Sequence, residues 1–220
     1  MMNDYIIFKQ TIINTAIQLY LLPIAENLKY INKTIIPPTQ QKEISRYKFQ
    51  HDSDKRLLAR SFCYEFVQEH YGVPNFELGF NEYQKPLLKA ALHINFSFSY
   101  AKDYVLVGIS TAKRIGIDIE YINPTFTIHE VAPEIMCAAE LEEFLSYKDK
   151  SLDQRIYFFK LFSAKESIIK AFGTGLYFNV KKLNTLHTHT YFYEGVKFTH
   201  QPLDVWMNEY TLSVCYEQKI

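Results

Sequence analysis

The chain has 220 residues, of which 48% are apolar and 22% charged, a composition typical of a folded globular protein. Its 24 basic residues equal its 24 acidic residues, so it lacks the basic excess by which a general nucleic-acid-binding protein is recognised. This length fits one domain or two small ones.

The cysteines and the apolar segments predict a cytoplasmic protein. Cys63, Cys137 and Cys215 are far apart and show no C-x-x-C spacing, so they suggest neither a zinc site nor a disulfide framework. The apolar segment 12–24 is interrupted by Asn14, Gln18 and Pro23, which argues against a membrane span. The amino terminus has no basic segment of the kind that opens a signal peptide. We expect a monomer of the cytoplasm with neither a membrane nor a nucleic-acid partner.

The first part of the chain predicts a helix followed by a sheet. Two prolines at 37 and 38 mark a loop, and residues 43–71 then have the apolar spacing of a long helix that ends at Gly72. The opening turns of this helix are basic, which fits either a solvated face or a site for an anion. The basic residues are Lys42, Arg46, Lys48, Lys55, Arg56 and Arg60. After a turn at 84–86, alternation over 93–100 predicts a strand with Ile94, Phe96, Phe98 and Tyr100 on one face and Asn95, Ser97 and Ser99 on the other.

The second part of the chain repeats this order. Two further strands are predicted at 104–110 and 115–122, helices follow over 127–172 with an interruption near 148–152, and strands return at 191–193, 196–198 and 210–214. Both halves therefore run from helix to sheet. A faint similarity between residues 95–100 and 211–216 is compatible with two related α+β lobes, 1–112 and 113–220.

Two carboxylates share one face of the strand at 115–120. Alternation places Gly116, Asp118 and Glu120 on the same side, with the isoleucines on the other. Neighbouring carboxylates repel each other unless a cation, a basic side chain or water relieves them. The segment is therefore either a ligand site or a solvated edge strand. Gly116 favours a site, because a missing side chain lets a ligand or a backbone approach closely.

A second polar group lies on the helix predicted at 157–172. Glu166 and Lys170 are four residues apart beside its apolar stripe, which fits either an ordinary surface ion pair or a site. Ser163 and Glu166 also match the spacing of a helix capping box. Lys165 interrupts the stripe, so its amine must reach solvent or find an anion. Carboxylates without nearby histidine or cysteine suit a hard cation, and Mg²⁺ held by carboxylates and phosphate oxygens is a common arrangement.

The two segments together resemble a family signature. Residues 116–120, Gly-Ile-Asp-Ile-Glu, followed by 162–170, Phe-Ser-Ala-Lys-Glu-Ser-Ile-Ile-Lys, are similar to the paired motifs of the Sfp-type 4′-phosphopantetheinyl transferases. Lys85-Pro86 and the strand at 95–99 resemble that family's Lys-Pro and Asn-x-Ser-His-Ser elements, in the same order. The resemblance implies an α+β fold of two similar lobes related by a pseudo-twofold. Each lobe would pack a small, mostly antiparallel sheet with helices, and the active site would lie in the cleft between them.

The resemblance also implies an activity. Members of the family use Mg²⁺ and coenzyme A to move the phosphopantetheine arm onto a serine of an apo acyl or peptidyl carrier protein of fatty-acid, polyketide or peptide synthesis, and they release adenosine 3′,5′-bisphosphate. By position, the metal ligands match Asp118, Glu120 and Glu166, and the catalytic residues match Glu166, Lys170 and Lys165. Glu166 would take the proton from the carrier serine, and the two lysines would lie near the pyrophosphate. The positions that match coenzyme A contacts are Lys42, Arg56, Lys85, Pro86, Ser97, Phe98, Asp118 and Lys170.

Two departures from the family pattern bear on this interpretation. Phe98 stands where the family usually has a histidine that helps to hold the cofactor phosphate, so one donor is lost and weaker coenzyme A binding is predicted. Phe162 replaces a tryptophan and keeps an aromatic ring in the core. One alternative, favoured by Phe98, is a non-catalytic relative that only binds coenzyme A or a carrier protein. The other is a different Mg²⁺-dependent phosphate-transfer enzyme. In the family interpretation, the lobe 1–112 serves the adenosine 3′-phosphate and the lobe 113–220 carries the metal and the catalytic residues.

Overall fold

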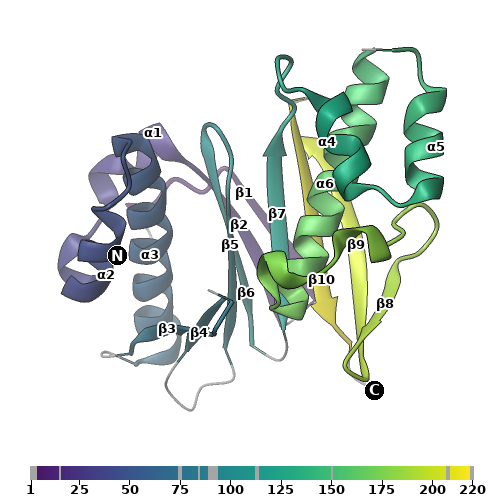
Figure 1. Ribbon diagram of the computed structural model, residues 1–220. Helices are drawn as coiled ribbons and strands as arrows, with labels where there is room; N and C mark the ends of the chain where they lie inside the picture. The colour runs from purple at the N-terminus through teal and green to yellow at the C-terminus, as the bar shows by residue number, and fades with distance from the viewer. Residues whose placement is uncertain are drawn as a thin grey trace. The chain divides into compact units, whose positions relative to one another are not determined.

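Two compact units make up the chain. The computed structural model describes residues 4–14, 16–73, 76–83, 85–88, 94–111, 114–149, 151–206 and 209–218. The first unit comprises Met1–Phe80 and Pro86–Ala112, and the second comprises Asn81–Lys85 and Lys113–Ile220. Each unit combines helices with an antiparallel sheet, which confirms the predicted α+β class (Figure 1). Within the described ranges, no helix combines the length and the hydropathy needed to cross a membrane.

The first unit is built on a six-stranded sheet in the order β1-β2-β6-β5-β4-β3. Its strands are β1 (Lys9–Asn14), β2 (Ile17–Pro23), β3 (Leu78–Phe80), β4 (Pro86–Leu88), β5 (Asn95–Tyr100) and β6 (Tyr104–Ser110), and its helices are α1 (Ile24–Asn27), α2 (Pro38–Ile44) and α3 (Gln50–Tyr71). The long helix α3 packs along the sheet, with Phe62 and Phe66 fully buried against Tyr20 of β2. Burial of these rings, together with the other apolar side chains of the same core, stabilises this unit.

The helix predicted at 43–71 is two helices. The first, α2, ends at Ile44 and is capped by Ser45, whose N–H donates to the carbonyl of Gln41, and α3 begins after the extended residue Phe49. As predicted, Gly72 ends α3, with a left-handed φ of 63°. The predicted strand at 93–100 is β5, and its first two predicted positions differ: Ile94 precedes the strand, and His93 lies outside the described residues, as does Gln84 of the predicted turn.

The second unit has a four-stranded sheet in the order β7-β10-β9-β8. Its elements are β7 (Ile115–Tyr121), α4 (Ile128–Ile135), α5 (Ala138–Ser146), α6 (Leu152–Phe172), β8 (Thr190–Tyr193), β9 (Val196–Trp206) and β10 (Tyr210–Glu217). The helix α6 packs across β7 and β10 (Figure 1). The predicted interruption near 148–152 is confirmed: α5 ends before it, and the Ser151 side chain caps α6 by accepting a hydrogen bond from the N–H of Gln154 at 3.1 Å.

Gly116 lets the backbones of β7 and α6 approach each other closely. A Cβ atom at this position would lie 2.0 Å from the carbonyl oxygen of Ser167 and 2.3 Å from the backbone nitrogen of Ala171. Neither atom can move without shifting the helix, so the contact requires glycine. Of the two close approaches expected at Gly116, by a ligand or by a backbone, the structure shows that of the α6 backbone. This contact fixes the distance between β7 and α6.

The turn Asn81–Lys85 belongs to the second unit because its side chains cap the carboxyl end of α6. Asn81 Nδ2 donates to the carbonyl of Gly173 at 2.9 Å, and Lys85 Nζ donates to the carbonyl of Ala171 at 3.0 Å. These carbonyls have no partner within the helix itself. Burial, together with the nearby Arg114 cation, lowers the pKa of Lys85 to about 7.

We expect Gly116→Ala to destabilise the protein by about 3 kcal/mol, the upper end of the usual cost of overpacking, because the added methyl group meets backbone atoms. Urea unfolding measures this change. Gly195→Asn is the matched control, since a Cβ there meets nothing within 4 Å and asparagine tolerates its φ of 75°. Equal stability of the Gly116→Ala protein and the wild type would contradict the close approach.

Candidate active site

The strand β7 presents Asp118 and Glu120 to α6, on the same side as Gly116. Although β7 is an edge strand of its sheet, Asp118 is only 2% exposed, and Glu120 is half-buried. A solvated outer face, the alternative left open by the sequence, is therefore wrong. The register of the sheet sets Asp118 opposite Ser213 of β10, whose hydroxyl contacts that of Ser167 in α6 at 2.9 Å. The carboxylates are held on the helix-facing side of the strand.

From the opposite direction, α6 brings Glu166 and Lys170 to these carboxylates. Lys170 Nζ donates to Asp118 Oδ1 at 2.6 Å, across 52 residues of sequence. Ser163 lies in the middle of α6, so the capping-box alternative is also wrong. Burial by itself would lower the pKa of Lys170, but the nearby carboxylates of Asp118, Glu166 and Glu120 raise it above its ordinary value. The Lys170 ammonium is therefore fully charged at neutral pH.

The electrostatics of this cluster are unbalanced. Burial, and then the charge of Asp118, raise the pKa of Glu120 to about 9, and the Lys170 cation opposes this shift. Burial and Asp118 likewise raise the pKa of Glu166. Three carboxyl groups thus share one ammonium within a partly desolvated region. Further positive charge at this point would stabilise the ionised carboxylates.

The chemistry of this donor set fits a hard divalent cation, because every ligand it offers is an oxygen. Across the described parts of the chain, no three His, Cys, Asp or Glu side chains stand together as a ready metal site. One reason is visible in the cluster, where the Lys170 ammonium engages an Asp118 oxygen. The residues fit the cation by chemistry and charge, and rotation of their side chains would be needed to close around it.

Lys165, which the resemblance assigns to the pyrophosphate, is directed elsewhere. Its side chain is 1% exposed, and Nζ forms an ion pair with Glu140 at 2.6 Å. The expectation that a lysine in the apolar stripe must find an anion is met by Glu140. Of the residues predicted for the second unit, the structure brings together Asp118, Glu120, Glu166 and Lys170, and it sets Lys165 in a separate network.

The residues of the first unit that were predicted to contact a cofactor lie on four elements, α2, α3, β4 and β5. Lys42 is exposed on α2. On α3, the Arg56 guanidinium lies over the ring of Tyr47 at 3.7 Å and over that of Tyr100 at 5.0 Å. Ser97 and Phe98 are consecutive residues of β5 and both are buried, and Phe98 belongs to the core, as the alternation predicted. Two further predicted contacts are Lys85, which caps α6, and Pro86, which is the first residue of β4.

Arg60, one of the six basic residues noted in the sequence, is a candidate that the family resemblance did not assign to the cofactor. Its guanidinium lies 4.6 Å from the centre of the Phe98 ring and 5.1 Å from that of Phe80. Its Nη1 atom is buried and has no hydrogen-bond partner among the described residues. The available signal was its spacing, because Arg60 follows Arg56 by one helical turn and so lies on the same face of α3. A buried guanidinium nitrogen without an acceptor suits an anionic ligand.

Comparison with known proteins points to one family for both halves of the chain. Residues 114–215 match the model of the 4′-phosphopantetheinyl transferase superfamily. Residues 22–112 match the model described as 4′-phosphopantetheinyl transferase, N-terminal. The two matches are adjacent and together include every element from α1 to β9 and most of β10.

Individual relatives carry the same description. The chain is 29% identical over 153 residues to 4′-phosphopantetheinyl transferase Sfp of Bacillus subtilis, covering 69% of this chain and 65% of the relative. It is 30% identical over 133 residues to 4′-phosphopantetheinyl transferase psf-1 of Bacillus pumilus, covering 60% and 55%. L-aminoadipate-semialdehyde dehydrogenase-phosphopantetheinyl transferase of Mus musculus is 28% identical over 162 residues, covering 67% and 52%. The chain thus spans less than two thirds of the length of these relatives.

The raised pKa of Glu120 predicts a pH-dependent stability in the absence of divalent cations. With a pKa of about 9 in the folded protein and 4.5 as its ordinary value, Glu120 contributes stability that is fully present below pH 4.5 and is lost as the pH rises through 9. Urea unfolding in a chelator from pH 5 to 9 should therefore show a smaller decline for Glu120→Gln than for the wild type. The exposed Glu134→Gln is the control. Parallel curves for the wild type and Glu120→Gln would contradict the assignment.

Proposed function

Because the chain belongs to the 4′-phosphopantetheinyl transferase superfamily, we propose that it transfers the phosphopantetheine arm of coenzyme A to a serine of an apo acyl or peptidyl carrier protein. The observation that carries the proposal is the cluster of Asp118, Glu120, Glu166 and Lys170, assembled from β7 and α6 within one unit. Both of its segments are those that resemble the family signature. The co-product of the reaction is adenosine 3′,5′-bisphosphate.

The family typically requires a divalent metal ion, and we propose Mg²⁺ held by Asp118, Glu120 and Glu166. Oxygen donors alone support a hard cation, and the raised pKa values of Glu120 and Glu166 indicate a shortage of positive charge that such an ion would relieve. When bound, Mg²⁺ supplies charge neutralisation at the pyrophosphate. The Lys170 ammonium, which pairs with Asp118 in this structure, would pair with a pyrophosphate oxygen.

In this proposal Glu166 is the general base. The hydroxyl oxygen of the carrier serine attacks the β-phosphorus of coenzyme A, the bond from that phosphorus to the bridging oxygen breaks, and adenosine 3′,5′-bisphosphate leaves with the bond electrons. The hydroxyl proton passes to the Glu166 carboxylate. A raised pKa makes Glu166 a better proton acceptor than a fully solvated carboxylate, provided that it is ionised. Positioning and charge stabilisation supply most of the rate enhancement in such transfers.

Residues of the first unit would contribute to binding of the adenosine 3′-phosphate. Lys42, Arg56 and Ser97 are the predicted contacts, and we add Arg60, whose Nη1 atom has no acceptor among the described residues. Arg60 lies against Phe98, the residue that replaces the family's histidine. A guanidinium beside this position can supply the positive donor that a phenylalanine lacks. Lys85 and Pro86 stay predictions for the adenine side of the cofactor.

The transfer itself is tested with the wild type, coenzyme A, Mg²⁺ and a panel of apo carrier proteins, followed by intact mass. We expect the arm to be added to at least one carrier, transfer to stop in a chelator and resume with Mg²⁺, and Glu166→Gln to slow transfer by about 10²–10⁴-fold, the usual contribution of a general base. The exposed Glu142→Gln on α5 is the control and should retain the wild-type rate. Failure to modify any carrier in the panel would refute the proposal.

The phosphate-binding assignment is tested by comparing the dissociation constants of coenzyme A and 3′-dephospho-coenzyme A. A hydrogen bond to a charged group is worth about 1.5–3 kcal/mol, so Phe98→His should tighten coenzyme A binding by about 10-fold or more, and Arg60→Leu should weaken it by a similar factor. Neither change should affect the dephospho analogue, which lacks the 3′-phosphate. Equal effects on both ligands would show that these residues do not meet that phosphate.

A further inference from the structure

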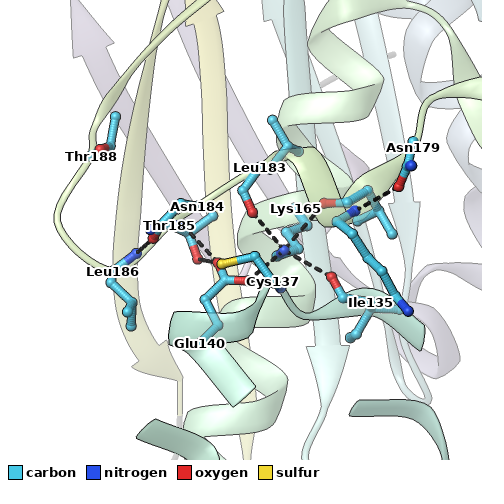
Figure 2. A network of polar contacts seen from close by, with 12 residues as sticks. Ile135, Cys137, Glu140, Lys165, Asn179, Leu183, Asn184, Thr185, Leu186 and Thr188 are labelled. Carbon is cyan, nitrogen blue, oxygen red and sulfur yellow. Dashed lines mark hydrogen bonds and ion pairs between the residues drawn. The ribbon is translucent and has the colours of Figure 1, made fainter. Parts of the chain in front are cut away.

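The ion pair between Lys165 and Glu140 is the most deeply buried charged contact among the described residues. The side chain of Lys165 is 1% exposed and that of Glu140 0%, with Nζ and Oε2 separated by 2.6 Å. Nζ also donates to the carbonyls of Ile135 and Leu183, each at 2.8 Å, and lies 3.2 Å from that of Val180. Figure 2 shows the ammonium in the middle of these acceptors. A lysine with only three N–H groups is therefore fully engaged.

Glu140 is engaged as completely as Lys165. Its Oε1 accepts from the N–H of Thr185 at 2.7 Å and from the Thr185 hydroxyl at 2.9 Å, and its Oε2 accepts from the N–H of Cys137 at 2.9 Å. Burial alone would raise the pKa of Glu140, but these donors and Lys165 lower it, so the carboxylate is ionised. Figure 2 shows Thr185 and Cys137 on either side of this carboxylate.

These contacts join four parts of the second unit. Ile135 is the last residue of α4, Cys137 is the cap of α5, and Val180, Leu183 and Thr185 belong to the segment between α6 and β8. The α4 carbonyl bound by Lys165 lies in the last turn of its helix, where orphan carbonyls favour a cation. A single side chain of α6 therefore anchors α4, α5 and the 180–185 segment.

The anchor adjoins Glu166, the proposed base. Successive residues of a helix are rotated by about 100°, so when Lys165 is fixed toward α4 and Glu140, the direction in which Glu166 leaves the helix is fixed as well. On other sides of α6, the Ser167 hydroxyl contacts Ser213 at 2.9 Å and Lys170 binds Asp118 at 2.6 Å. With the Gly116 contact, these attachments leave α6 little freedom to turn about its axis.

We propose that Lys165 and Glu140 are positioning residues. They fix the rotation of α6 about its own axis, and this rotation orients the Glu166 carboxylate toward the reacting hydroxyl. This inference rests on the proposed transferase function. Stability alone is a poor reason for such a pair, because apolar residues of similar size often serve as well as a buried ion pair. The pair also fixes orientation, since seven polar contacts hold the two side chains and three backbone segments in one arrangement.

The test uses the double variant Glu140→Gln/Lys165→Met, which removes both charges and leaves neither buried alone. We expect kcat for transfer to fall by about 10-fold or more, while KM for coenzyme A changes less than about 2-fold. The reason is that a wrongly oriented Glu166 carboxylate weakens stabilisation of the transition state but not binding of the ground state. Thr185→Val, which removes only the hydroxyl donor to Glu140, should lower kcat in the same direction by a smaller factor, and it remains informative if the double variant does not fold.

Gln154→Leu is the matched control. Gln154 is also buried in α6, and its side-chain amide donates to the carbonyl of Phe144 in α5 at 3.1 Å, eleven positions before Lys165 and therefore about three helical turns from Glu166. Its loss should lower the melting temperature without the kcat effect. A double variant with the wild-type kcat, or a control with an equal loss of kcat at equal stability, would overturn the proposal.

Hydrogen exchange separates this inference from the proposed function. In the ligand-free protein, the amides of residues 163–170 should exchange faster in the double variant than in Gln154→Leu, whatever the enzyme acts on. If the wild type modifies no carrier but this difference is observed, the transferase proposal fails and the anchoring of α6 stands. If exchange over 163–170 is the same in both variants, the anchoring itself is refuted.

Discussion

The contact between β7 and α6 at Gly116 is the constraint on which the rest of the second unit depends. Because no side chain separates the two backbones, the strand and the helix are close enough for Lys170 to reach Asp118. Side chains of β7 and α6 that are about 50 positions apart in the sequence thereby form one polar cluster. A side chain at Gly116 would push the helix away and separate the carboxylates of β7 from those of α6.

This closeness has an electrostatic cost that the ligand-free protein carries. Three carboxyl groups meet one ammonium where solvation is reduced, and the pKa of Glu120 rises to about 9 as a result. Apolar packing on the other side of α6, where Ile168 and Phe172 are buried against Phe198, holds the arrangement together. The unit thus uses its core to keep in place a group of charges that would separate if left alone, a relation typical of binding sites for ions.

Local patterns predicted those features that depend on neighbouring residues in the chain. Alternation in β7 and helical spacing in α6 were enough to place Asp118, Glu120, Glu166 and Lys170 on polar faces. The split between α2 and α3 was missed, since no glycine or proline marks residues 45–49. So was β2, whose residues are nearly all buried and therefore do not alternate. The partner of Lys165 could not be predicted either, because Glu140 is brought to it only by the packing of α5 on α6.

The cap on α6 means that the two halves of the sequence are not independent modules. The helix that carries Glu166 and Lys170 ends on donors from Asn81 and Lys85, which occur 92 and 86 positions before the carbonyls they bind. The chain therefore enters the second unit, returns to the first and enters the second again. A fragment that begins at residue 113 would contain every carboxylate of the cluster but would lack the side chains that finish its central helix. In evolutionary terms, recombination between the halves would have to preserve this five-residue turn.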